Sequence, residues 1–140
     1  MSGKKLLIVI PCYNEEEALP STLKRMETLM NKMLGEKLID KNSRVMFVDD
    51  GSADNTWQIL KKGVGKTPFF EALRLSRNFG HQSAILAGMF DNEADIYVTI
   101  DADLQDDPDC IVEMLQKIKA GADIVYGVRR ERSSDTWFKR

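Results

Sequence analysis

Short apolar runs alternate along the chain with longer stretches in which apolar residues recur at helical spacing. The first run, residues 6–10, is almost continuously apolar, which is typical of a parallel strand buried on both faces. Pro11 is expected to end this strand. Further β-branched and aromatic runs predict strands at residues 45–48, 69–75, 96–100 and 123–126.

Helices are predicted between these strands. From Glu15 to about Leu34, apolar side chains recur three or four residues apart, on one helical face. Three more helices are expected to begin at a cap on Asp54 or Asn55, at residue 82, and at the pair Asp107–Pro108. This order predicts a single α/β domain over residues 1–140, with a mostly parallel, doubly wound sheet and helices on both faces.

Composition narrows the functional classes. The 20 basic and 22 acidic residues give a net charge of −2, so the chain has no basic field for nucleic acid, and we exclude that partner. Cys12 and Cys110 share no metal-binding spacing and are expected to be free thiols in a reducing cytoplasm. No apolar stretch approaches the roughly 18 residues of a membrane span. We therefore expect a cytoplasmic segment.

Polar side chains follow every predicted strand. In an open parallel sheet, ligands bind beyond the carboxyl ends of the strands, so these exits are expected to form one rim around a site. The exits concentrate carboxylates and guanidinium groups beyond what a solvated loop needs. They are residues 11–15, 49–52, 77–81, 101–105 and 127–129.

The most informative exit holds Asp101 and Asp103. Because side chains alternate along an extended strand, the two carboxylates are expected to point to one side and Ala102 to the other. Their repulsion would be relieved by a hard cation such as Mg²⁺ or Mn²⁺, with Gln105 as a further oxygen ligand. The alternative is that acids here only cap the next helix, which is the role expected of residues 106 and 107, because Pro108 marks the helix start.

The other exits are open to two interpretations. The run 49–52 forms a tight turn in which Gly51 takes a positive φ; one of its carboxylates accepts from a base or ribose, or both serve the turn. His81, the only histidine, is expected to be a structural or substrate-contact group, with no carboxylate partner identifiable in the sequence. Arg77, Arg129 and Arg140 are candidate clamps for a diphosphate. A dinucleotide fingerprint and a P-loop are both lacking.

Taken together and in order, these runs resemble those of family-2 glycosyltransferases. The resemblance is to the polyprenyl-phosphate sugar transferases, which include dolichyl-phosphate mannose synthases and bactoprenol glucosyltransferases, and it implies a GT-A-type fold and a role in cell-envelope glycans. The runs that carry it are Ile10–Glu16, Val48–Ser52, Ser76–Gln82 and Asp101–Pro108.

The resemblance also implies roles for individual residues. Asp103 would be the chief metal ligand, Asp101 would lie near the ribose or the metal, and Gln105 would join the metal–diphosphate site. Arg129 and, by weaker analogy, Arg140 would bind phosphate. The nucleoside of the donor would be contacted by Pro11, Tyr13, Glu15, Val48 and Asp50. The implied reaction inverts the sugar's configuration as a lipid phosphate oxygen attacks the anomeric carbon.

Members of that family continue beyond this length with acceptor-binding elements. We therefore expect a truncated donor-binding part of a longer protein that associates with the cytoplasmic face of a membrane, and we make no prediction of oligomeric state. UDP-glucose is the first donor expected and GDP-mannose the second. Two alternatives stay open: a sugar-1-phosphate nucleotidyltransferase, although that class usually has a Gly-rich loop after the first strand, and a non-catalytic nucleotide-sugar-binding module.

Overall fold

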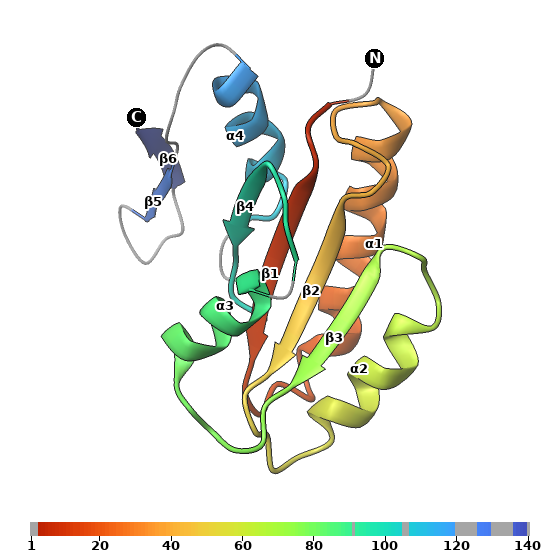
Figure 1. The fold of residues 1–140 in the computed structure, drawn as a ribbon, viewed down its shortest axis with the longest axis vertical. Helices are drawn as coiled ribbons and strands as arrows, with labels where there is room; N and C mark the ends of the chain where they lie inside the picture. The colour runs from red at the N-terminus through yellow and green to blue at the C-terminus, as the bar shows by residue number, and fades with distance from the viewer. Residues whose placement is uncertain (1–2, 91, 105–106, 120–125, 130–135, 140) are drawn as a thin grey trace.

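A computed structural model describes residues 3–90, 92–104, 107–119, 126–129 and 136–139 of the 140-residue chain. Strands and helices alternate through most of this length (Figure 1). The elements are β1 (Leu6–Cys12), α1 (Leu19–Gly35), β2 (Arg44–Asp49), α2 (Thr56–Val64), β3 (Phe70–Arg74), α3 (His81–Phe90), β4 (Ile96–Thr99), α4 (Cys110–Lys119), β5 (Tyr126–Arg129) and β6 (Thr136–Lys139).

The first four strands form one parallel sheet in the order β3-β2-β1-β4. The chain builds outward from β1 through β2 to β3 and then returns to place β4 on the other side of β1. Strand order therefore reverses between β1 and β4, and in open α/β sheets the crevice beyond such a switch point is where ligands bind. The predicted parallel, doubly wound fold is confirmed.

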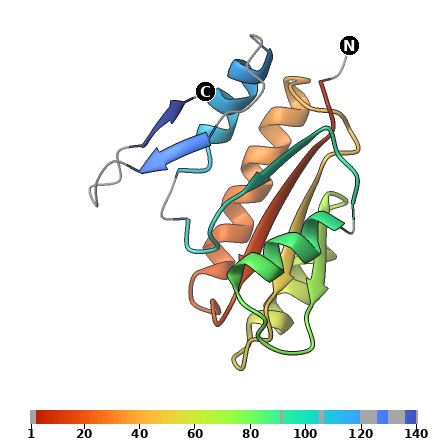
Figure 2. The same cartoon turned by 60° about the vertical axis from the view of Figure 1, so that its left-hand side comes forward.

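Each face of the sheet has its own hydrophobic core, because alternate side chains of the strands point to opposite faces. Leu6, Ile8 and Ile10 pack on one face with the buried sides of α1, α2 and α4. Leu7 and Val9 pack on the other face in a smaller cluster that includes Ala84 of α3. Figure 2 shows α3 and α1 on opposite sides of the strands. Helices thus cover both faces, as expected.

Two predicted boundaries near the first strand are wrong. β1 continues through Pro11 to Cys12, and Pro11 pairs in register with Val48. The pairing of β4 reaches only Val9, so on that side Pro11 has no ladder hydrogen bond to lose. The first helix begins at Leu19 and not at Glu15, with a proline in its first turn, where the missing N–H costs nothing.

The predicted fifth strand also differs from the structure. β5 begins at Tyr126, and it pairs antiparallel with β6 in a separate two-stranded sheet, so it does not extend the parallel sheet. The predicted run 123–126 otherwise lies outside the described residues. Residues 127–129, expected to follow a strand, lie within β5, and β6 occupies a segment for which no element was predicted. In the described part of the chain, no helix combines the length and apolar character that crossing a membrane requires.

Candidate functional site

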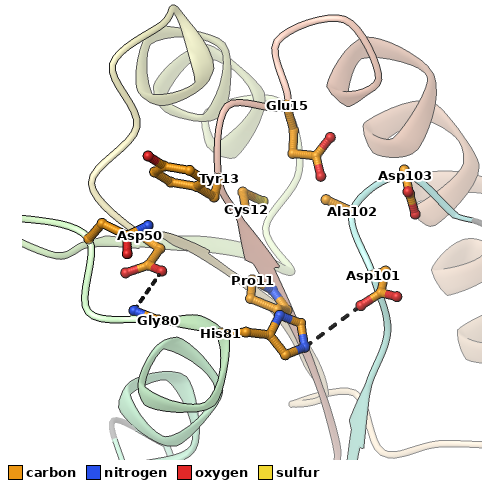
Figure 3. A pocket seen from close by; sticks show the side chains of 11 residues that line it. Pro11, Cys12, Tyr13, Glu15, Asp50, Gly80, His81, Asp101, Ala102 and Asp103 are labelled. Carbon is orange, nitrogen blue, oxygen red and sulfur yellow. Dashed lines mark hydrogen bonds and ion pairs between the residues drawn. The ribbon is translucent and has the colours of Figure 1, made fainter.

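A pocket of about 390 Å³ lies at the carboxyl ends of β1, β2 and β4, where the strand order reverses. Its walls come from four segments that are far apart in sequence, so the pocket exists only once the sheet has formed (Figure 3). The lining residues are Pro11, Cys12, Tyr13, Glu15, Asp50, Asn78, Gly80, His81, Asp101, Ala102 and Asp103.

Asp101 and Asp103 both line this pocket, and Ala102 between them is 1% exposed and packs in the core. The geometry differs from the extended strand end that we expected. Residues 101–104 form a turn closed by a 3.1 Å hydrogen bond from the Leu104 N–H to the Asp101 carbonyl, and Leu104 has a φ of 51°. A leucine in the left-handed region is strained, and such strain persists where the surrounding structure holds it.

Glu15 brings a third carboxylate to the same pocket from the β1 exit. Its pKa is raised above the ordinary value of 4.5, first by burial and then by the negative charges of Asp103 and Asp101. The opposite side of the pocket therefore acts electrostatically on Glu15. A concentration of negative charge of this kind favours a bound cation.

Side chains from the β2 exit hold the β1 exit in place. The Asn14 N–H donates to Ser52 Oγ at 2.8 Å, and the Glu15 N–H donates to Thr56 Oγ1 at 2.9 Å. Asp54 accepts from the Glu16 N–H at 3.2 Å. Burial acts to raise the pKa of Asp54, but hydrogen bonds from Thr56 and the Glu16 N–H outweigh it and lower that pKa. The carboxylate of Glu15 is thereby presented from a fixed backbone.

The two adjacent aspartates after β2 take different roles. Asp49 Oδ1 accepts from the Ser52 N–H at 3.1 Å and so holds the turn, while Oδ2 faces Arg74 Nε at 3.6 Å. Asp50 lines the pocket, and its two oxygens accept from the N–H groups of Phe79 and Gly80. One aspartate therefore serves its own turn and the other ties that turn to the loop before α3.

His81 has the carboxylate partner that the sequence did not reveal. Its Nε2 lies 3.8 Å from Asp101 Oδ1 across the pocket (Figure 3). Both side chains are about half exposed, at 57% and 51%. The expectation that His81 has no identifiable acidic partner is therefore wrong, because 20 residues of sequence separate two groups that the sheet brings together.

The remaining predicted site residues either lie outside the pocket lining or have side chains outside the described part of the structure. Val48 is fully buried in the core beneath α3 and does not line the pocket. Arg77 stacks on the ring of Phe79, with its guanidinium carbon 4.3 Å from the ring centroid. Arg129 pairs through its backbone with Thr136 in the β5–β6 sheet, and its side chain lies outside the described part of the structure. Gln105, Asp106 and Arg140 also lie outside the described residues.

Four pocket residues, Cys12, Asn78, Gly80 and Ala102, were given no site role from the sequence, although all four lie in the runs that were singled out. Cys12 is buried, and its pKa is raised by that burial and then by Glu15 and Asp49. The helix cap expected at Asp107 takes a modified form: Asp107 Oδ1 accepts from the Asp109 N–H at 3.0 Å, and α4 starts at Cys110, two residues after Pro108.

The donor groups at the pocket bear on whether a hard cation can bind there. Among the described residues, no group of three or more histidines, cysteines and acids is arranged to hold a metal by itself. Carboxylate oxygens of Asp101 and Asp103 are the ligand type that Mg²⁺ and Mn²⁺ prefer. The described donors therefore fit an open site at which a bound ligand and water complete the coordination, and they do not fit a closed structural one.

Comparisons with known proteins agree with this geometry. The family model for glycosyl transferase family 2 matches residues 7–140. A relative described as the uncharacterized glycosyltransferase YkoT of Bacillus subtilis (strain 168) is 44% identical over 137 residues, which cover 96% of this chain and 41% of the relative. The chain spans about two fifths of the length of the curated relatives it matches.

Solved structures support the fold at lower identity. Glucosyl-3-phosphoglycerate synthase from Mycobacterium tuberculosis, in complex with Mn²⁺, UDP and glucosyl-3-phosphoglycerate, has a TM-score of 0.65 at 19% identity, covering 88% of this chain and 43% of that one. The mannosyltransferase PcManGT from Pyrobaculum calidifontis, in complex with GDP-Man and Mn²⁺, has a TM-score of 0.59 at 18% identity, covering 74% and 28%. These likenesses establish a GT-A-type fold, and with the match over residues 7–140 the chain belongs to glycosyl transferase family 2.

Proposed function

We propose that this domain binds a nucleoside-diphosphate sugar in the pocket between the β1, β2 and β4 exits, for transfer of the sugar to an acceptor. The observation that carries the proposal is the placement of Glu15, Asp101 and Asp103 around one pocket at the switch point of a parallel sheet. The diphosphate of such a donor is negatively charged, and so are the carboxylates of this solvent-accessible pocket. The donor therefore fits the pocket only if a cation lies between the two.

The nucleoside half of the donor is assigned to the β1 and β2 exits. Tyr13 is 49% exposed at the pocket, so its ring is available to contact a base or ribose. Pro11 and Glu15 line the same wall, and the hydrogen bonds that the β1-exit backbone donates to Ser52 and Thr56 fix that backbone. Preorganisation of this kind lowers the entropy cost of binding.

The diphosphate half is assigned to the turn after β4. Asp103, Asp101 and Gln105 would hold Mg²⁺ or Mn²⁺, which would neutralise charge that builds up on the departing diphosphate. Mn²⁺ accompanies the nucleotide in both structural neighbours described above, whose likeness to this chain is one of fold. Arg129 and Arg140 are proposed to contact phosphate.

For the whole protein we propose an inverting transfer of a hexose to a polyprenyl phosphate. An oxygen of the acceptor phosphate attacks the anomeric carbon, the bond from that carbon to the donor phosphate breaks, and its electron pair leaves on the nucleoside diphosphate. A phosphate acceptor is already anionic at neutral pH, so positioning matters more than removal of a proton. Such an acceptor places the whole protein at the cytoplasmic face of a membrane.

The proposal is tested by calorimetric titration of the domain with UDP-glucose, GDP-mannose and a nucleoside triphosphate in the presence of Mn²⁺. We expect saturable binding of one nucleotide sugar. When the triphosphate and a sugar phosphate are supplied together, we expect no release of pyrophosphate. Pyrophosphate release would identify a nucleotidyltransferase instead. No binding of any nucleotide sugar would remove the proposed function from this pocket.

A further inference from the structure

The Asp50 carboxylate is buried at the edge of the pocket, with 3% of the residue exposed. Its Oδ1 accepts from the Phe79 N–H at 2.8 Å and its Oδ2 from the Gly80 N–H at 3.1 Å. Both oxygens of one ionisable group are therefore directed at two consecutive backbone amides. Hydrogen bonds to a charged acceptor are stronger than those between neutral groups, so this contact fixes the loop firmly.

The neighbouring backbone shows how closely the two loops are packed. The Leu75 N–H donates to the Asp49 carbonyl at 2.9 Å, where β3 ends beside β2. A methyl group added to Gly51, which has a φ of +70°, would lie 2.3 Å from the Arg77 carbonyl carbon. The loop of residues 76–80 thus rests directly on the turn after β2, and only glycine allows that approach.

This 76–80 loop leads into the wall of the pocket that faces the β4 exit. Asn78, Gly80 and His81 line the pocket, and α3 begins at His81. His81 Nε2 lies 3.8 Å from Asp101 Oδ1 on the opposite side. A displacement of the amides of residues 79 and 80 would therefore move the histidine relative to Asp101.

We propose that Asp50 is a positioning residue, which shapes the donor pocket by holding the 76–80 loop and affects donor binding through that loop. This inference rests on the proposed function, and it departs from the expectation that Asp50 contacts the nucleoside. If Asp50 acted by contacting the nucleoside, its hydrogen bonds from the Phe79 and Gly80 amides would be incidental. In our proposal, these two hydrogen bonds are the means by which Asp50 acts on the site.

The test measures amide hydrogen exchange of Phe79 and Gly80 by NMR, without donor, in the wild-type domain and in Asp50→Asn. Asparagine keeps one acceptor oxygen and turns an NH₂ group toward the other amide. We expect exchange at one or both amides to become at least about tenfold faster, the factor that corresponds to loss of one charge-assisted hydrogen bond. Unchanged exchange at both amides overturns the proposal.

Asp54→Asn is the matched control. Asp54 also follows β2 and also accepts from backbone N–H groups, but its partners are Glu16 on the β1 side and Thr56 at the start of α2, and it does not line the pocket. We expect this variant to leave the exchange of Phe79 and Gly80 unchanged. Equal acceleration in both variants would mean that any loosening of the β2 exit frees the loop, and the specific role of Asp50 would be wrong.

Donor titration then separates positioning from direct contact. We expect Asp50→Asn to weaken nucleotide-sugar binding, and Gly51→Ala to weaken it as well, because that variant displaces the loop while the Asp50 carboxylate is kept. Weaker binding in Asp50→Asn with both amides still protected would show direct contact and overturn the proposal, as would faster exchange with unchanged affinity. If the wild-type domain binds no nucleotide sugar, the proposed function fails while the exchange data still decide whether Asp50 holds the loop.

Discussion

Thr22 Oγ1, on the buried side of α1, lies 2.5 Å from the carbonyl oxygen of Ala102 and donates a hydrogen bond to it. The two residues are 80 positions apart in sequence, and the contact anchors the turn that carries Asp101 and Asp103 to the first helix of the domain. α1 therefore supports the acidic turn directly, in addition to covering the sheet.

Replacing Thr22 by valine keeps the shape of the side chain and leaves the buried Ala102 carbonyl without this donor. We expect the free energy of unfolding to fall by about 1–3 kcal/mol, the usual cost of a buried polar group left unsatisfied. Denaturant unfolding measures it. Thr28→Val is the matched control, because the exposed Thr28 hydroxyl bonds only to the Lys24 carbonyl within the same helix. Equal losses in the two variants would contradict the anchoring role.

Gly51→Ala is expected to destabilise the domain, because residue 51 has a φ of +70° and its added methyl group would meet the backbone of Arg77. The left-handed conformation alone costs an alanine roughly 1–2 kcal/mol, and the steric conflict adds to that. Gly35→Ala, at the end of α1, meets nothing within 4 Å and serves as the control. Thermal unfolding of both variants checks the difference; a loss at residue 35 as large as at residue 51 would refute it.

The raised pKa of Glu15 has a consequence for stability. The pKa of this carboxyl group is higher in the folded state than its ordinary value of 4.5. Its contribution to stability is therefore fully present at pH values below 4.5 and is lost as the pH rises through the folded pKa. At neutral pH, ionised Glu15 therefore lowers stability. We expect Glu15→Gln to unfold at a higher temperature than the wild type at about pH 7, with the difference shrinking toward acid pH.

Glu17→Gln is the control for that comparison, since Glu17 is exposed and does not line the pocket. A rise in unfolding temperature for Glu15→Gln that is constant across the pH range, or one matched by Glu17→Gln, would count against the electrostatic explanation. Addition of Mn²⁺ is expected to reduce the advantage of Glu15→Gln, because a cation at Asp101 and Asp103 offsets their charge.

Cys12 is expected to be unreactive in the native state although it lines the pocket. It is 1% exposed, and burial, followed by Glu15 and Asp49, raises its pKa, so the reactive thiolate is scarce near neutral pH. In Cys110→Ser, where Cys12 is the remaining thiol, alkylation by iodoacetamide should be at least about a hundredfold slower in the folded than in the denatured protein. Comparable rates would show that the pocket opens to the thiol.

The sequence was sufficient to predict the architecture because apolar runs and helical periodicity report burial directly. The strand starting at Leu6 and the helix ending near Gly35 follow from that pattern. The start of α1 was predicted wrongly because the apolar face can be extended back to Glu15. In the structure the N–H groups of residues 15 and 16 donate tertiary hydrogen bonds to Thr56 and Asp54, which hold them in the loop. Pro20 was the available local signal.

Pairwise relationships in the site were harder to foresee. Four of the five runs singled out in the sequence contribute residues to one pocket, since parallel strands end at one edge of the sheet, whereas the run 127–129 lies in β5 and does not line it. The facing of His81 and Asp101, and the use of Asp50 by two amides of another loop, depend on side-chain directions after three crossovers. The antiparallel pairing of β5 with β6 likewise depends on a partner that apolar periodicity does not specify.

The measurement that bears most directly on the account is calorimetric titration of the domain with a nucleotide sugar, with and without Mn²⁺, for the wild type, Asp103→Asn and Asp109→Asn. Asp109 is exposed and lies outside the pocket, so its variant controls for the loss of one charge. We predict that Mn²⁺ strengthens donor binding in the wild type and in Asp109→Asn, and that Asp103→Asn loses this gain. An undiminished metal-dependent gain in Asp103→Asn would contradict it.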